Sequence, residues 1–165
     1  MVSKVAADRF DVDNDEFDPT LNKPLIGAAG VHCVAAELSL RGLIALPTIR
    51  NTAGTDIVVI NPAGTWFANL QVKTSRSRLA FWPLGKHFEC WTGPHDYYVF
   101  LRWLKAQRTF EIFLESAKAV AERADSTLKQ EKARRGGLAW SPCFHFKSDA
   151  ERLRRKWMTS GIGHA

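Results

Sequence analysis

Cysteine is scarce in this chain of 165 residues, and the three cysteines lie far apart, at Cys33, Cys90 and Cys143. Isolated cysteines provide neither the framework of a disulfide-rich secreted domain nor the close pairs that hold a structural zinc ion. The sequence therefore argues against both classes. We expect reduced thiols that are mostly buried.

Long hydrophobic runs are also missing. No segment approaches the ~20 apolar residues that cross a bilayer as a helix, and the N-terminus lacks the basic-then-apolar layout of a secretory signal. We therefore expect a cytoplasmic protein. Internal repeats are absent, and the hydrophobic fraction of 45% with six tryptophans argues against disorder. The length is most simply that of one domain.

Charge is unevenly distributed along the chain, whose net charge is +6. Residues 1–20 contain six acidic side chains against two basic ones, whereas residues 129–156 contain nine basic against three acidic. We interpret residues 1–24 as an acidic, flexible arm and residues 25–165 as a single domain with basic C-terminal helices. The basic segment suits a polyanion such as nucleic acid, and a solvated helix surface is an equal alternative.

Hydrophobic periodicity and turn residues predict an alternation of helices and strands. The stretch 27–42 is typical of a helix with one buried stripe and a C-terminal glycine. The other expected elements are strands at 43–49, 96–104, 109–114 and 144–146, a hairpin at 54–73, and helices at 116–135 and 148–158. This order predicts an α/β (α+β layered) domain, in which a mixed sheet is flanked by helices.

The hairpin carries a polar group of residues that does not suit a core. With a four-residue loop at 61–64, Ile60 would face Thr65 and Asp56 would face Asn69, so that Asp56 and Gln71 would be diagonal neighbours. Opposed residues share one face of a sheet, and so do residues two apart along a strand. One face of the hairpin therefore gathers an acid, two amides and a lysine: Asp56, Asn69, Gln71 and Lys73. Such a group is typical of a functional site.

Four segments follow one another in a recognisable order: Gly27-x-x-Gly30, a helix ending in Leu-Arg-Gly42, Gly-Thr-Asp56-Ile-Val, and Gln71-Val-Lys73-Thr. Together they resemble the PD-(D/E)xK nuclease superfamily. The resemblance is strongest to small bacterial proteins related to Mrr-type restriction enzymes and Holliday junction resolvases, which often carry a D…QxK motif. It covers residues 27 to about 103. It implies a restriction-endonuclease-like core, with a helix before a mixed β-sheet, and a DNA endonuclease that hydrolyses phosphodiester bonds.

The resemblance also implies a role for each residue of the polar group. Asp56, Gln71 and the backbone carbonyl of Val72 would bind Mg²⁺, for which Mn²⁺ is a substitute. Lys73 would orient the attacking water and offset charge on the phosphate, so the catalytic residues would be Asp56, Gln71 and Lys73. DNA would be the partner, and enzymes of this kind often cut duplexes as homodimers.

Further residues are candidates for contacts around this site. Those expected to contact DNA are Arg50, Asn69, Thr74, Arg76, Arg78 and Lys86. Two polar residues of the preceding helix, His32 and Glu37, lie off its buried stripe and are accessory candidates, with a plain surface role as the alternative.

The sequence departs from the family pattern at Val31. Related proteins tend to have a glutamate here, after the glycine, and that side chain points at the metal. With a valine in this position and a neutral Gln71, Asp56 is the one carboxylate of the predicted site. Two alternatives to an active enzyme therefore stay open: a catalytically inactive DNA-binding module on the same fold, and a protein-interaction module whose basic helix meets an acidic partner or the chain's own arm.

Overall fold

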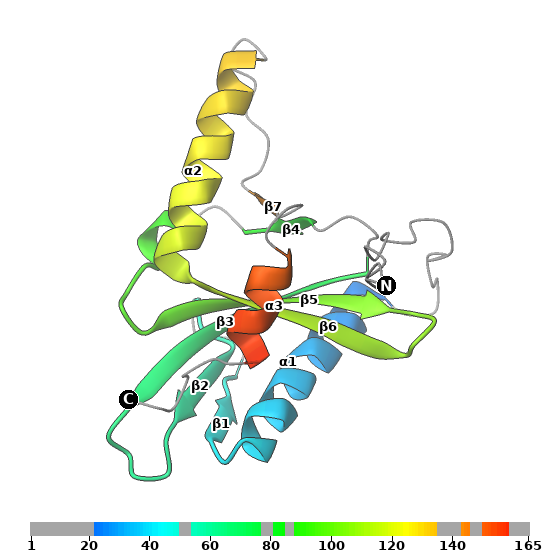
Figure 1. Ribbon diagram of the computed structural model, residues 1–165, viewed down its shortest axis with the longest axis vertical. Helices are drawn as coiled ribbons and strands as arrows, with labels where there is room; N and C mark the ends of the chain where they lie inside the picture. Colours follow the sequence, from blue (N-terminus) through cyan, green and yellow to red (C-terminus); the bar gives the residue numbers. More distant parts are fainter. Residues whose placement is uncertain are drawn as a thin grey trace, which may run out of the picture.

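The computed structural model describes residues 22–49, 54–76, 81–84, 88–134, 143–145 and 150–158 (Figure 1). The predicted acidic arm up to residue 21 lies outside these ranges, and so do Arg50, Arg78 and Lys86. In chain order the elements are α1 (Lys23–Leu40), β1 (Ile44–Pro47), β2 (Ile57–Ile60), β3 (Phe67–Ser75), β4 (Phe81–Pro83), the 3₁₀ turn η1 (Phe88–Cys90), β5 (Asp96–Leu104), β6 (Thr109–Ser116), α2 (Ala117–Arg134), β7 (Cys143–His145) and α3 (Ala150–Met158). None of the helices in the described ranges is long and apolar enough to cross a membrane.

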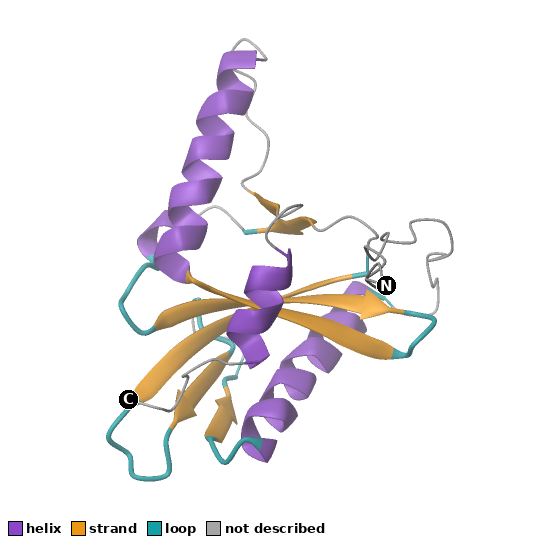
Figure 2. Cartoon of the chain, in the orientation of Figure 1, coloured by secondary structure: helices purple, strands orange, loops and turns teal. Residues whose placement is uncertain are grey.

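A mixed β-sheet forms the centre of the described structure, with the strand order β1-β2-β3-β5-β6. β3 and β5 run parallel, while the β1–β2, β2–β3 and β5–β6 pairs are antiparallel. A smaller sheet pairs β4 with β7. The predicted fold class is confirmed, because α1 precedes a mixed sheet and helices flank it (Figure 2).

Each face of the sheet has its own hydrophobic core, because side chains alternate between the faces along each strand. On one face, α1 packs against the strands through Val34 and Leu38, which are fully buried. On the other face, Phe100 and Phe113 are covered by the β4–β7 pair, α2 and the first part of α3. A polar residue on β2 or β3 therefore lies either beneath α1 or on the face covered by the β4–β7 pair, α2 and α3.

Helix α1 begins four residues before the predicted start. Asn22 caps it, since the Asn22 side chain accepts a hydrogen bond from the N–H of Leu25 (3.0 Å), and Pro24 stands in the first turn. The helix ends as predicted before Gly42, whose φ of 81° is in the left-handed region that favours glycine. The start was missed because the capping pair Asn22 and Pro24 precedes the hydrophobic stripe.

The β2–β3 hairpin has a different register from the predicted one. Ile60 pairs with Phe67 and Val58 with Asn69, so the pairing is shifted by two residues. The connection is longer because the Asn61 side chain organises it: Oδ1 accepts from the Trp66 N–H (3.0 Å) and Nδ2 donates to Thr65 (2.9 Å). A shift of two residues preserves the faces. Asp56 itself lies just beyond the last pair, Ile57 with Leu70, and its N–H bonds to the Leu70 carbonyl.

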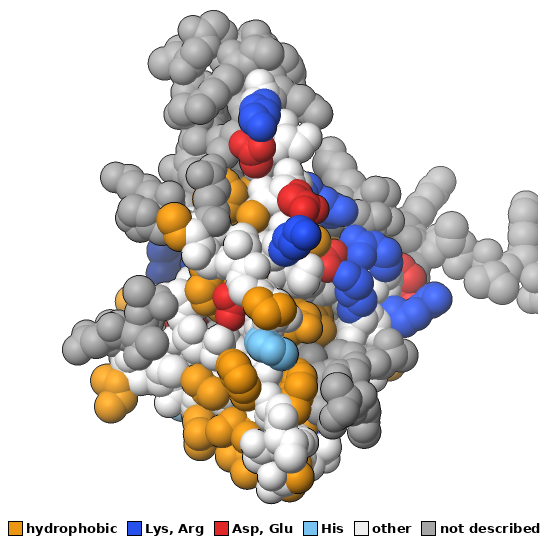
Figure 3. Space-filling model, turned by 90° about the vertical axis from the view of Figure 1, so that its left-hand side faces the viewer, with side chains coloured by type: hydrophobic (Ala, Val, Ile, Leu, Met, Phe, Trp, Pro, Cys, Tyr) orange, Lys and Arg blue, Asp and Glu red, His pale blue; other side chains and the backbone are white. Residues whose placement is uncertain are grey.

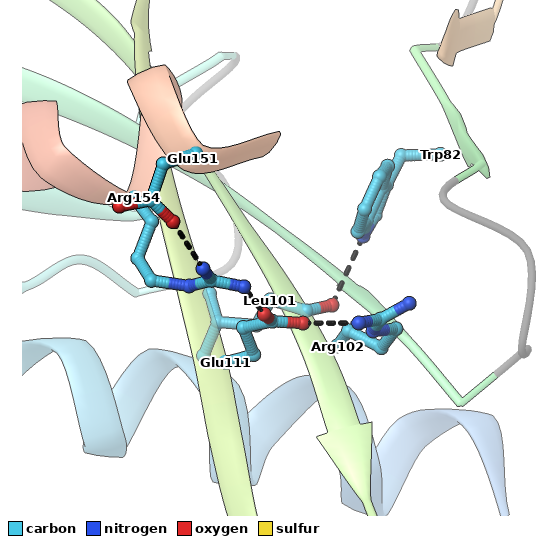
Figure 4. Close-up of polar contacts among 6 residues, drawn as sticks. All are labelled: Trp82, Leu101, Arg102, Glu111, Glu151 and Arg154. Carbon is cyan, nitrogen blue, oxygen red and sulfur yellow. Dashed lines mark hydrogen bonds and ion pairs between the residues drawn. The ribbon is translucent and has the colours of Figure 1, made fainter. Parts of the chain in front are cut away.

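Helix α3 is bound to the sheet by ion pairs with carboxylates of β6 (Figure 4). Glu111 binds Arg154 of α3 and Arg102 of β5, and Glu115, only 3% exposed, binds Arg152 at 3.1 Å and also binds Lys156. Three basic side chains of α3 are therefore paired with carboxylates of β6. This supports a structural role for α3.

Exposed hydrophobic side chains occur on the β1–β3 part of the sheet. Ile44, Leu46 and Phe67 are 44%, 49% and 49% exposed, and the register places them on one face. Seen from the side, hydrophobic side chains lie over the lower half of the molecule, whereas most lysines and arginines lie above it (Figure 3). The apolar and the basic surfaces are thus separate on this side.

Candidate functional site

β2 and β3 separate next to Ile57, where their pairing ends. The backbone N–H of Asp56 donates to the Leu70 carbonyl (2.8 Å), and the N–H of Val72 donates to Oδ2 of the Asp56 carboxylate (2.7 Å). The carboxylate thus replaces a strand carbonyl as the acceptor for β3. Because the N–H and C=O of one strand residue point to the same neighbouring strand, the Val72 carbonyl also faces this opening. We call Asp56, Gln71, Val72 and Lys73 the fork.

The backbone of Asp56 is held from the opposite direction as well. Thr48, just after β1, donates its N–H to the Asp56 carbonyl (2.9 Å) and its hydroxyl to the Thr55 carbonyl (2.6 Å). Asp56 therefore stands outside the regular strand but is fixed by hydrogen bonds on both sides. These hydrogen bonds of the sheet contribute to the position of its carboxylate.

Gln71 and Lys73 occupy the face of the sheet opposite α1, each half-buried, and pair with Tyr98 and Phe100 of β5. Burial lowers the pKa of the Lys73 ammonium, and the Asp56 carboxylate opposes that shift. Within the described part of the chain, the side chains of Gln71 and Lys73 and Oδ1 of Asp56 have no hydrogen-bond or ion-pair partner. The fork therefore presents polar groups that have no partner among the described residues.

Tyr98 is the residue of β5 that pairs with Gln71. Burial, assisted by the nearby Asp96 carboxylate, raises the pKa of Tyr98 to about 12. The phenol consequently stays protonated at neutral pH. Tyr98 is 1% exposed and belongs to the hydrophobic core on the face opposite α1.

The residues expected to contact DNA have different surroundings. Asn69 donates its side-chain amide to Oδ1 of Asp96 (2.9 Å), which links β3 to the loop before β5. Thr74 points to α1, where its hydroxyl is buried and has no hydrogen-bond partner among the described residues. Arg76 is half-buried just after β3. A role of these residues in DNA binding remains a prediction.

α1 approaches β3 closely at Gly30. A Cβ on this residue would overlap the Thr74 hydroxyl, so the helix and the strand can approach this closely only because residue 30 is a glycine. The following residue, Val31, is half-buried and packs against the core on this face. This turn of α1 therefore brings an aliphatic side chain, not an oxygen, to the sheet.

The two accessory candidates on α1 have surface environments. His32 is exposed, and Glu37 lies 3.8 Å from Arg41 in an ion pair one helical turn away. The structure gives neither residue a contact with the fork. Their surface role is the simpler interpretation.

Two residues that sequence reasoning did not single out border the fork. Gly54 has a φ of 83°, and the ring of Trp91 lies directly against it. A glycine two residues before the acid was a visible signal of unusual backbone. Nothing in the sequence pointed to Trp91, which is 37 positions further along the chain.

The donor atoms at the fork are all oxygens: the free carboxylate oxygen of Asp56, the Gln71 amide oxygen and the Val72 carbonyl. Hard divalent cations prefer oxygen ligands, and Mg²⁺ needs few from the protein because waters and substrate phosphates complete its octahedron. In the described ranges, no group of three or more His, Cys, Asp and Glu side chains could hold an ion. The oxygens of the fork are of the type that Mg²⁺ prefers, and one carboxylate, Asp56, is among them.

Comparison with known proteins identifies a solved structure of similar fold. The bacterial homing endonuclease I-Ssp6803I aligns with 87% of this chain and 94% of its own, at a TM-score of 0.53 and 12% sequence identity. No family model matches the chain, and no curated protein matches it. At this identity the likeness shows the fold alone, a nuclease-like arrangement of a mixed sheet and flanking helices.

Proposed function

We propose that this chain is a Mg²⁺-dependent DNA endonuclease of the PD-(D/E)xK superfamily, which hydrolyses phosphodiester bonds at the fork. Three lines support the proposal: the D…QxK spacing, the hydrogen bond that joins Asp56 to the N–H of Val72 between Gln71 and Lys73, and the fold shared with a homing endonuclease. The observation that carries it is that Oδ1 of Asp56 and the side chains of Gln71 and Lys73 have no partner among the described residues at this opening of the sheet.

Each residue of the fork has a role in this proposal. Asp56, Gln71 and the Val72 carbonyl hold the ion, and Lys73 orients the attacking water and offsets the negative charge that develops on the phosphate. A bound Mg²⁺ supplies Lewis-acid stabilisation of the phosphate oxygens. Asp56 has a second task, because it favours the charged form of Lys73 against the effect of burial.

The proposal is tested with supercoiled plasmid, the full chain, and Mg²⁺ or Mn²⁺ against EDTA. Lys73→Met is expected to slow cleavage by ~10²-fold, because it removes a preorganised charge next to the scissile phosphate. Lys105→Met is the matched control, since Lys105 is a half-buried lysine in the turn after β5, away from the fork. Nicked and linear DNA should appear with metal and disappear with EDTA. Equal cleavage by the parent and Lys73→Met, or no cleavage with any divalent ion, contradicts the proposal.

A second candidate function is a catalytically silent DNA-binding module, which the half-buried Val31 favours. A site with one carboxylate depends heavily on substrate phosphates for metal binding. If the parent chain binds DNA without cutting it, binding should weaken steeply with salt and need no metal.

Restoring the family's helix carboxylate distinguishes the two functions. If the parent does not cut DNA, the Val31→Glu variant is expected to cut it in a metal-dependent way, because the substitution adds a second carboxylate ligand. His32→Glu adds the same charge at the exposed neighbouring position and is expected to give none. Gel retardation at several salt concentrations accompanies the assay. Cleavage that rises equally in both variants, or absence of DNA binding by the parent at low salt, refutes the silent-module alternative.

A further inference from the structure

The indole of Trp91 lies against the backbone of Gly54, two residues before Asp56. A Cβ at Gly54 would be 3.0 Å from Cδ1 and 3.3 Å from Nε1 of Trp91, so the ring approaches as closely as the missing side chain allows. Gly54 also has a φ of 83°, a conformation that other residues rarely adopt. The backbone that leads into Asp56 therefore rests on this ring.

Trp91 is supported in turn by the sheet. Its ring meets Tyr98 edge-on, with centroids 5.0 Å apart and an angle of 85° between the ring planes. Tyr98 is buried and pairs with Gln71 across β3 and β5. Trp91 thus contacts both Tyr98, which pairs with the proposed ligand Gln71, and Gly54, which precedes the proposed ligand Asp56.

The loop that carries Trp91 is attached to β3. Asp96 accepts the Gly93 N–H at Oδ2 (2.8 Å) and the Asn69 side-chain amide at Oδ1 (2.9 Å). The backbone N–H of Asn69 donates to the His95 carbonyl (2.9 Å). Both carboxylate oxygens of Asp96 are therefore engaged, one within the loop and one with the strand that carries Gln71 and Lys73.

We propose that Trp91 is a positioning residue for Asp56. Its indole supports Gly54, so that the Asp56 carboxylate keeps the Val72 N–H at Oδ2 and presents Oδ1 to the metal. The expected effect on cleavage rests on the proposed nuclease function, whereas the effect on the Asp56–Val72 hydrogen bond does not. Trp91 acts through Gly54, since it bonds to none of the four residues of the fork in the described structure.

Amide hydrogen exchange of Val72, measured by NMR on the full chain, tests the proposal without any catalysis. Trp91→Ala is expected to speed exchange of the Val72 amide by at least ~10-fold, because its acceptor becomes mobile. Val59 and Val99, whose side chains are fully buried in the core of the same sheet, report whether the fold is intact. Trp91→Phe retains a ring and should give a smaller increase, which keeps the test valid if the alanine variant does not fold.

Trp103→Ala is the matched control. Trp103 is also a half-buried tryptophan with one aromatic neighbour at 5.0 Å, Phe110, but it lies near the far end of β5. Trp103→Ala should leave the exchange rate of the Val72 amide unchanged. If Val72 exchanges in Trp91→Ala and Trp91→Phe as in the parent, or equally fast in Trp103→Ala, the positioning role is wrong.

Kinetics on a DNA substrate complete the test. Trp91→Ala is expected to lower kcat by about 10–100-fold with little change in KM, as for residues that orient a metal ligand. A loss confined to KM would overturn the positioning role. If Val72 exchange rises as expected but no chain cuts DNA, Trp91 positions Asp56 and the nuclease proposal fails.

Discussion

Replacing Asp56 with asparagine is expected to slow metal-dependent cleavage by about 10³-fold and to leave the free energy of unfolding nearly unchanged. The asparagine oxygen can still accept the Val72 N–H that now bonds to Oδ2 (2.7 Å). The amide nitrogen would then occupy the place of Oδ1, where a donor group repels a cation. The substitution removes the proposed metal ligand and its charge while keeping the hydrogen bond that closes the sheet.

Plasmid cleavage and urea unfolding together measure the two effects. Asp56→Ala removes the acceptor as well and should lower the free energy of unfolding by about 1–3 kcal/mol. Asp125→Asn serves as the control, because Asp125 pairs with Lys129 on α2, away from the fork, at a partly exposed position. Cleavage by Asp56→Asn at the parent rate would falsify the metal role. A loss of stability equal to that of Asp56→Ala would instead show that the hydrogen bond needs the charge.

Replacing Phe100 with alanine is expected to lower the free energy of unfolding by about 3–5 kcal/mol. Phe100 is 0% exposed and stacks against Tyr98 and Phe144, with centroid distances of 5.6 and 4.6 Å. Trp82 closes the cluster at 5.3 Å. Because β4, β5 and β7 all contribute rings, the remaining side chains have little freedom to fill the cavity. The pairing of Phe100 with Lys73 places this cavity directly beside the fork.

Urea denaturation followed by circular dichroism gives the measurement. An unchanged slope of the free energy of unfolding against urea concentration would show that the variant exposes the same amount of surface on unfolding. Phe67→Ala is a control of the same residue type, 49% exposed at the start of β3, and should lose about 1 kcal/mol. If Phe100→Ala and Phe67→Ala lose the same free energy of unfolding, the prediction is wrong, because the ring cluster would then contribute no additional stability.

The layered fold was predictable because its strands alternate strictly or are apolar on both faces. β3 illustrates this, since Ala68, Leu70 and Val72 all point to α1 while Gln71 and Lys73 point away. The hairpin register was not predictable in the same way. It depends on side-chain hydrogen bonds of Asn61, and a turn formed by Asn, Pro and Gly is compatible with several loop lengths.

The sequence predicted which residues form the candidate site, but not the contacts that hold them in place. Strand periodicity is local, so it could place Asp56, Gln71 and Lys73 on one side of a hairpin. The support of Gly54 by Trp91 and the pairing of β4 with β7 join residues 37 and more positions apart. Contacts of this kind leave no periodic trace in the sequence. The basic segment shows the same limit, because its pairing with Glu111 and Glu115 appears only when α3 is docked on β6.

The way in which the Asp56 carboxylate closes the sheet determines which residues position 72 can accept. This position contributes only its backbone to the fork, an N–H for Asp56 and a carbonyl for the opening, while its side chain enters the core beneath α1. Many apolar side chains of similar volume can therefore stand between the glutamine and the lysine. Proline cannot, because it lacks the N–H that holds the acid in place. The middle position of the QxK motif therefore tolerates several apolar side chains but requires a residue with a backbone N–H.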